Sequence, residues 1–167
     1  RKHSMPQISD PSSVALVVFD VDGVFTDGRI LIGPQGEEYK TFHTRDGHGV
    51  KRLMASGRQV AIISGRNAPA VDHRMTELGV QHVFQGCKDK LPVLKALLKK
   101  LDISLENVAY MGDDLPDLEV MQSVGLPVTV SDGAPEIRSA ASIVTQAAGG
   151  HGAVREFCDM LLNGIDQ

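Results

Sequence analysis

Two carboxylates one residue apart are the side chains of this chain best placed to do chemistry. Asp20 and Asp22 follow the apolar run 17–19, and Gly23 comes directly after them. Such a run is typical of a buried strand that ends in a turn. Because side chains alternate along a strand, the two carboxylates start on the same side and repel each other unless a cation or a proton lies between them. Magnesium suits this position, since it binds carboxylates together with phosphate oxygens.

Polar residues also follow two further apolar runs. Ser64 comes after 59–63, and Asp113 comes after 108–111. Taken singly, each has an ordinary structural interpretation, because Asp and Ser are favoured in turns and at helix starts. In a parallel sheet, however, ligands bind outside the carboxyl ends of the strands. Three polar strand ends therefore favour one shared site over three unrelated turns.

The elements that must position these residues alternate between strands and helices. The sequence predicts strands at 15–21, 59–63, 82–84, 108–111, 126–130 and 143–145. It predicts helices from 46 to about 56, at 67–78 with Asn67 as the N-cap, at 90–101, after 117, at 135–140 and up to about 162. A β-hairpin is expected at 29–44, next to the Asp-rich turn. This alternation predicts an α/β fold with a doubly wound, mostly parallel sheet and a projecting hairpin.

Composition limits the possible classes of protein. The 167 residues are 42% hydrophobic, which fits one domain, expected at 14–167 after a loose segment 1–13. Residues 1–4 resemble a leader added for expression. A net charge of −4 argues against a nucleic-acid partner, and no apolar run is long enough for a membrane. Cys87 and Cys158 suggest neither a disulfide framework nor a zinc site, so a cytoplasmic location is expected.

Four spaced motifs resemble those of the haloacid dehalogenase superfamily. They are Asp20-Val21-Asp22-Gly23, Ser64 after an apolar strand, Lys90, and Gly112-Asp113-Asp114. More narrowly, the chain from about 14 to 162 resembles the 3-deoxy-D-manno-octulosonate 8-phosphate phosphatases in the stretches DVDGVFTDG, RDGHG, IISGR, GDDLPD and GGHGAVREFCD. The resemblance implies a Rossmann-like fold and the hydrolysis of a sugar-acid phosphate in lipopolysaccharide precursor synthesis.

The chemistry expected of these motifs is phosphoryl transfer to an aspartate. Asp20 would be the nucleophile, and Asp22 would protonate the leaving alkoxide and then activate water. Ser64 and Lys90 would hold the phosphoryl oxygens. Magnesium would be held by the Asp20 carboxylate, the Asp22 backbone carbonyl and Asp113. Asp114 and Asp117 are ranked below Asp113 and are expected to be partly structural.

For the sugar acid, the resemblance implies a larger set of contacts. The residues are Asp22, His43, Thr44, Arg45, Asp46, Gly47, Lys51, Arg66, Arg74 and Lys90. Arg66 and Arg74 are eight residues apart, so on one helix they would point the same way. Lys51 and His151 stand where the family pattern has arginine, which leaves the identity of the sugar open.

The spacing of the motifs leaves no room for a cap domain over the site. Only the hairpin at 29–44 follows the first motif, and 64–90 has room for one helix and one short strand. The resemblance implies a homotetramer in which the hairpins form a central barrel and the C-terminal tail of a neighbour, at 147–167, closes the site. The apolar run 30–32 fits that assembly, and the alternative is a hairpin packed on its own subunit.

Three other functions remain open. The first is the same chemistry on a related nonulosonate 9-phosphate. The second is a non-catalytic, tetramerising phosphatase-like module, which would be expected to have lost acidic residues that are all present here. The third is a phosphorelay receiver, in which the phosphoacceptor and the acidic pair lie on separate strands, whereas Asp20 belongs to the pair in this chain.

Overall fold

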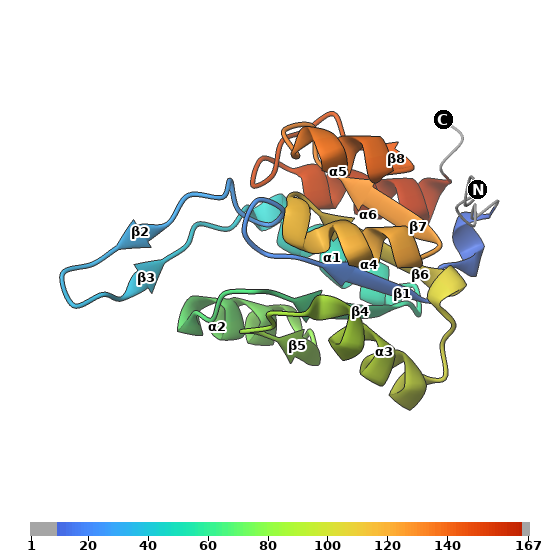
Figure 1. The fold of residues 1–167 in the computed structure, drawn as a ribbon, viewed down its shortest axis with the longest axis horizontal. Coiled ribbons are helices and arrows are strands. Elements are labelled where there is room, and N and C mark those ends of the chain that lie inside the picture. Colours follow the sequence, from blue (N-terminus) through green and yellow to red (C-terminus); the bar gives the residue numbers. More distant parts are fainter. Residues whose placement is uncertain (1–9, 165–167) are drawn as a thin grey trace.

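The computed structural model describes residues 10–164, so the proposed leader at 1–4 lies outside the described residues. Within them, six parallel strands form one sheet in the order β5-β4-β1-β6-β7-β8 (Figure 1). The strands are β1 (Leu16–Phe19), β4 (Gln59–Ile63), β5 (His82–Phe84), β6 (Val108–Gly112), β7 (Leu126–Thr129) and β8 (Ile143–Val144). The predicted doubly wound α/β sheet is confirmed.

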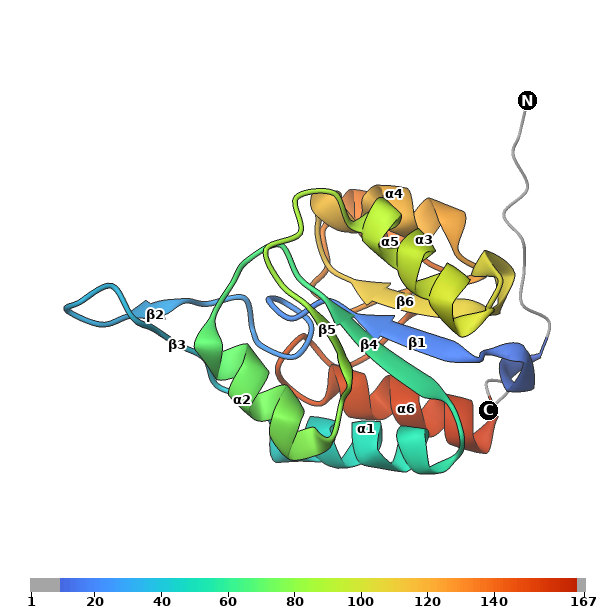
Figure 2. The ribbon, with the colours of Figure 1, turned by 90° about the horizontal axis from the view of Figure 1, so that it is seen from below.

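Helices cover both faces of this sheet (Figure 2). They are α1 (Thr44–Ala55), α2 (Pro69–Leu78), α3 (Lys90–Leu101), α4 (Leu118–Ser123), α5 (Pro135–Ala140) and α6 (Ala153–Asn163). Helices α1, α2 and α6 lie on one face, and α3, α4 and α5 lie on the other. No helix within the described part of the chain is long and apolar enough to cross a membrane.

Strand β1 is apolar throughout because both of its faces are covered. Val17 and Phe19 pack in the cluster that includes Phe157 of α6, whereas Leu16 and Val18 pack in the cluster that includes Leu94 of α3. All four strand residues are fully buried, as expected for the centre of a parallel sheet. The core thus fixes the strand end from which Asp20 emerges.

Strand order reverses direction beside β1. The chain runs from β1 to β4 and β5 on one side, and then crosses back to β6, β7 and β8 on the other. In doubly wound sheets, ligand sites lie at the carboxyl ends of the strands at such a reversal. Asp20 follows β1 and Asp113 follows β6, so the sheet topology itself brings these two residues together.

The hairpin projects away from the sheet, and its strands are shorter than the expected span of 29–44 (Figure 1). Strand β2 is Leu31–Ile32 and strand β3 is Glu38–Tyr39, with Leu31 opposite Tyr39. The flanking segments are not paired as strands. Strand β1 is also shorter than expected and ends at Phe19, so Asp20 and Asp22 both lie in the turn that follows it.

Candidate active site

The carboxyl ends of β1 and β6 gather three acidic side chains. Asp20, Asp113 and Asp117 each have a carboxylate oxygen within 4.8 Å of the others. Burial and the carboxylate of Asp117 raise the pKa of Asp20 to about 7, although the ammonium of Lys90 acts in the opposite direction. Burial and the carboxylates of Asp20 and Asp117 raise the pKa of Asp113 to about 8. Carboxylates held this close together favour a bound cation.

Lys90 is the buried cation beside this cluster. It is the first residue of α3, and its side chain is 4% exposed. Its Nζ lies 3.1 Å from Asp20 Oδ2 and 2.7 Å from Asp117 Oδ1. Burial lowers the pKa of Lys90, but the two carboxylates outweigh burial and the net shift is upward. A charged ammonium therefore stands next to the proposed nucleophile.

Asp117 lines the cavity over the cluster, and its carboxylate oxygens are already hydrogen-bonded within the protein. It accepts hydrogen bonds from Lys90, from the Tyr110 hydroxyl at 2.5 Å, and from the backbone N–H groups of Asp113 and Asp114 at 3.0 and 3.3 Å. Asp114 in turn accepts from the N–H of Leu115 and caps the short 3-10 turn Leu115–Asp117. These contacts confirm that Asp114 and Asp117 are partly structural.

Gly23 lets the turn after β1 approach Asp113. Its φ of +84° lies in the left-handed region, and a Cβ at this position would lie 1.9 Å from Asp113 Oδ2. Glycine therefore meets two separate demands here, the backbone conformation and the close approach of a carboxylate. A larger residue would force the acidic side chains of the two strand ends apart.

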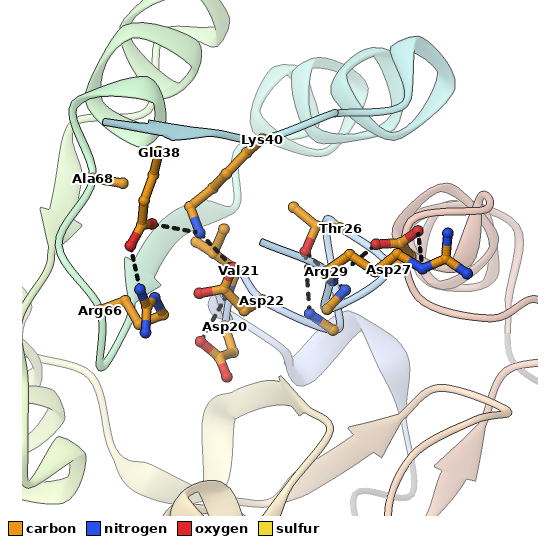
Figure 3. A network of polar contacts seen from close by, with 12 residues as sticks. Asp20, Val21, Asp22, Thr26, Asp27, Arg29, Glu38, Lys40, Arg66 and Ala68 are labelled. Atoms are coloured by element: carbon orange, nitrogen blue, oxygen red, sulfur yellow. Dashed lines mark hydrogen bonds and ion pairs between the residues drawn. The ribbon is translucent and has the colours of Figure 1, made fainter. Parts of the chain in front are cut away.

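Asp22 is held from the hairpin side (Figure 3). Lys40 Nζ lies 2.5 Å from Asp22 Oδ1 and 3.6 Å from Glu38 Oε2. The other oxygen of Glu38 accepts a hydrogen bond from the guanidinium of Arg66. A chain of ion pairs therefore connects Asp22 to Arg66, which enters the site from the loop after β4.

A cavity of about 450 Å³ lies over the acidic cluster. It is lined by residues that follow β1, β4, β5 and β6 and by the hairpin base, including Asp20, Asp22, Ile30, Ser64, Arg66, Cys87, Lys88, Lys90, Asp113, Pro116 and Asp117. The predicted catalytic and metal-binding residues thus line a single cavity. Another cavity, of about 250 Å³, lies near Arg58 and His82 and has no acidic side chain in its lining.

Part of the predicted sugar-binding set lies outside this cavity. Thr44, Arg45 and Lys51 are exposed on α1, and the side chain of His43 caps that helix by accepting from the N–H of Arg45. Asp46 is fully buried, and its Oδ1 accepts from the N–H of Arg155 in α6 at 3.0 Å. Within one subunit, these residues line no common cavity with Asp20 in the described structure.

Arg66 and Arg74 do not share a helix face, so that expectation is wrong. Pro69 sets the start of α2, because the residue before a proline is driven into an extended conformation, as Ala68 is. Asn67 is therefore not the N-cap, and Arg66 stays in the loop. A Cβ on Gly47 would lie 2.3 Å from Arg74 Nη2, which places the guanidinium of Arg74 over α1 rather than over the cavity.

Sequence reasoning missed Tyr110, Glu38 and Lys40. Tyr110 is fully buried in β6, and its hydroxyl donates to Asp117. Its sequence signal is weak, since aromatic residues are common in strands for packing reasons alone. Glu38 in β3 and Lys40 just after it stand two residues apart, which in an extended chain is the spacing of a shared face. The sequence shows this spacing, but it does not show that the shared face contacts Asp22 and Arg66.

Comparison with known proteins first identifies the broad class of enzyme. Residues 82–157 match a family model described as haloacid dehalogenase-like hydrolase. The sheet order and the acidic strand ends described above belong to the same class. This match runs from β5 into the first half of α6, and therefore includes Lys90 and Asp113 but not the strand that leads to Asp20.

Relatives of nearly the same length narrow the class. The chain is 49% identical over 155 residues to 3-deoxy-D-manno-octulosonate 8-phosphate phosphatase from Escherichia coli K12, covering 93% of this chain and 82% of that protein. The crystal structure of the Yersinia pestis phosphatase matches with a TM-score of 0.90 at 47% identity, covering 92% of this chain and 83% of that one. The chain belongs to the family of 3-deoxy-D-manno-octulosonate 8-phosphate phosphatases.

A third relative was solved with ligands. The phosphatase of that name from Moraxella catarrhalis, in complex with magnesium, phosphate and the sugar KDO, matches with a TM-score of 0.89 at 42% identity, over 92% of this chain and 88% of that one. These three ligands belong to the relative. They correspond to the metal and phosphoryl group expected from the residues of this chain and to the sugar acid that the resemblance implies.

Proposed function

We propose that this chain is a magnesium-dependent phosphomonoesterase that hydrolyses 3-deoxy-D-manno-octulosonate 8-phosphate to the free sugar acid and phosphate through an aspartyl-phosphate intermediate. The observation that carries the proposal is the meeting of Asp20, Asp113 and Lys90 in one cavity from three separate elements. The family and the ligands of the Moraxella catarrhalis relative support the substrate.

The residues present fit a magnesium ion. Burial and neighbouring carboxylates, Asp117 for Asp20 and Asp20 with Asp117 for Asp113, disfavour the ionised forms of Asp20 and Asp113, and a divalent cation bound by both would reverse that effect. Asp117 is already committed to Lys90, Tyr110 and two backbone N–H groups, so we assign the ion to Asp20, Asp113 and the backbone carbonyl of Asp22. Bound there, magnesium would supply charge neutralisation between nucleophile and phosphate.

The residues of the chain carry the two proton and bond changes. The carboxylate of Asp20 attacks phosphorus as the bond to the sugar oxygen breaks, and Asp22 gives its proton to that oxygen. In the second half, Asp22 takes a proton from water, which attacks phosphorus and frees the carboxylate of Asp20. Lys90 and Ser64 line the same cavity and are placed to hold the phosphoryl oxygens, where charge develops.

A panel of sugar phosphates tests this proposal by the release of inorganic phosphate. With Mg²⁺ present, we expect the octulosonate 8-phosphate to be the best substrate. Asp20→Asn is expected to abolish release, whereas Asp72→Asn, on the exposed face of α2, leaves it unchanged. A nonulosonate 9-phosphate preferred by more than tenfold would replace the substrate. Full activity in excess chelator would refute the metal site.

The same proposal includes a homotetramer built on the hairpin. Leu31 is 66% exposed, Ile32 is 62% exposed and Tyr39 is 55% exposed, which is unusual for large apolar side chains on a projecting element. We expect light scattering to give a tetramer and Leu31→Asp to give smaller species. A monomeric wild type with full substrate selectivity would remove the role of the assembly.

The C-terminal tail predicted at 147–167 to close a neighbour's site is mostly part of its own subunit. In residues 147–164 the chain packs on its own subunit, since Phe157, Cys158 and Leu161 of α6 are buried in the core beside α1. Residues 165–167 lie outside the described residues. A cytoplasmic location and a role in lipopolysaccharide precursor synthesis are part of this proposal. The free cysteines Cys87 and Cys158 support the location, and the substrate supports the role.

A further inference from the structure

Lys40 is buried beside the site although it does not line the cavity. Its side chain is 1% exposed, and its Nζ lies 2.5 Å from Asp22 Oδ1. Within residues 10–164, no other side chain donates a hydrogen bond to the carboxylate of Asp22. A buried ammonium needs a partner of opposite charge, and an aspartate held by a single ammonium takes its direction from it.

Lys40 directly follows β3, and the extended segment 38–40 has two different faces. Glu38 and Lys40 lie on the face toward the site, because residues two apart in an extended chain share a side. Tyr39, between them, points the other way, is 55% exposed and stands opposite Leu31. The segment 38–40 therefore presents two ion-pairing side chains inward and the Tyr39 ring outward.

The inward side chains of Glu38 and Lys40 contact two separate segments that line the cavity. Lys40 reaches Asp22 in the turn after β1, and Glu38 reaches Arg66 in the loop after β4. Glu38 Oε2 is buried and has Lys40 as its neighbour at 3.6 Å, so the two anchors also support each other. The positions of two cavity-lining residues thus depend on a hairpin that the sheet itself does not hold.

We propose that Lys40 is a positioning residue for Asp22 and that Glu38 positions Arg66, so that the hairpin sets the geometry of the proposed acid/base. This inference rests on the proposed function. It assigns no chemical step to Lys40 itself, because its ammonium acts only through the carboxylate of Asp22.

Leaving-group chemistry separates this role from a merely structural one. A sugar alkoxide needs a proton as it leaves, so cleavage of the sugar phosphate depends on a well-placed Asp22. A p-nitrophenolate leaves as a stable anion and needs little help from an acid. Since kcat/KM reports the steps up to formation of the aspartyl-phosphate, a misplaced acid lowers kcat/KM for the first substrate and not for the second.

The experiment compares Lys40→Met with wild type on the octulosonate 8-phosphate and on p-nitrophenyl phosphate. We expect kcat/KM for the sugar phosphate to fall about 100-fold and that for the aryl phosphate to change by less than about threefold. Lys99→Met, on the exposed face of α3, is the matched control and changes neither. An equal loss on both substrates, or no loss on either, overturns the proposal.

Two further variants keep the test decisive. If Lys40→Met does not fold, Lys40→Arg keeps the charge but moves the donor, and a smaller loss confined to the sugar phosphate is expected. In an Asp22→Asn background, Lys40→Met is expected to have almost no further effect, because the residue through which it acts is gone. A second loss of the full size there overturns the proposal.

Failure of the proposed function gives a different result. A wild type that prefers another alkyl phosphate contradicts the proposed substrate, and the same ratio measured on that ester still tests Lys40. A wild type that hydrolyses neither alkyl nor aryl phosphates overturns both the proposed function and the role of Lys40.

Discussion

Replacing Lys90 by methionine removes the one ammonium that the described structure places against the proposed nucleophile. Methionine keeps most of the length and volume of the side chain, so packing around α3 is nearly unchanged. What is lost is a charge that lies 3.1 Å from Asp20 and 2.7 Å from Asp117. Two buried carboxylates are then left without their counter-ion.

The size of the effect follows from these distances. At an effective dielectric constant of about 20, each pair has a gross attraction of about 5–6 kcal/mol, most of which desolvation of the charges offsets. Breaking a buried pair by removing one partner costs about 3–5 kcal/mol of the free energy of unfolding. Loss of one donor to the developing phosphoryl charge is expected to lower kcat about 100- to 1,000-fold.

Chemical denaturation and phosphate release measure the two effects separately. Lys99→Met, an exposed lysine on the same helix, is the control and is expected to change the free energy of unfolding by less than about 0.5 kcal/mol. The double variant Lys90→Met with Asp117→Asn should lose less than the sum of the two single losses, because the pair is already broken. A stability loss no larger than that of Lys99→Met would refute the buried ion-pair argument.

Three further predictions concern glycine, pH and the core. Gly23→Ala places a Cβ 1.9 Å from Asp113 Oδ2, so calorimetric titration is expected to show at least about tenfold weaker Mg²⁺ binding. The control is Gly57→Ala, which also has a positive φ, of +96°, but open space around it, and it should not weaken Mg²⁺ binding. Burial raises the pKa of Asp46, so its contribution to stability is present below its unfolded pKa and is lost as pH rises through the folded value. Asp46→Asn should therefore gain stability relative to wild type as pH rises above about 4 in urea titrations, and a difference that stays constant with pH would contradict this. Phe157→Ala leaves a cavity between α6 and the sheet and is expected to cost about 3–5 kcal/mol by the same titrations, whereas a cost below about 1 kcal/mol would contradict this packing.

The sheet and the acidic end of it could be predicted because their signals are local. Strand β4 at 59–63, β5 at 82–84 and α3 at 90–101 have the predicted bounds, since apolar runs and a leucine stripe define them without reference to the rest of the chain. The meeting of Asp20 and Asp113 followed from a single topological rule for parallel sheets. Errors appeared where a local signal had two explanations, as at Asn67, which resembles an N-cap but precedes the real helix start at Pro69.

The contacts of the hairpin could not be predicted because they depend on its direction in space. An alternating run shows that Glu38 and Lys40 share a face, but not that the face meets Asp22 and Arg66. The role of the predicted substrate-binding residues on and next to α1 could not be predicted for a similar reason. A list carried over from a resemblance does not say whether His43 and Lys51 serve the cavity of their own subunit or another one.

The glycine-rich link after β8 packs against the turn after β1 within the same subunit, and this contact accounts for its glycines. The N–H of Gly150 donates to the carbonyl of Val24 at 3.1 Å, and a Cβ on Gly149 would lie 1.9 Å from the carbonyl oxygen of Gly23. The link therefore presses directly against the turn that carries Asp22, and only residues without a side chain allow that approach. The turn is held by this link on one side and by Lys40 on the other, so the catalytic geometry depends on segments more than a hundred residues apart in sequence. Closure of the site by a neighbouring subunit is a separate part of the proposal, and the glycines do not require it.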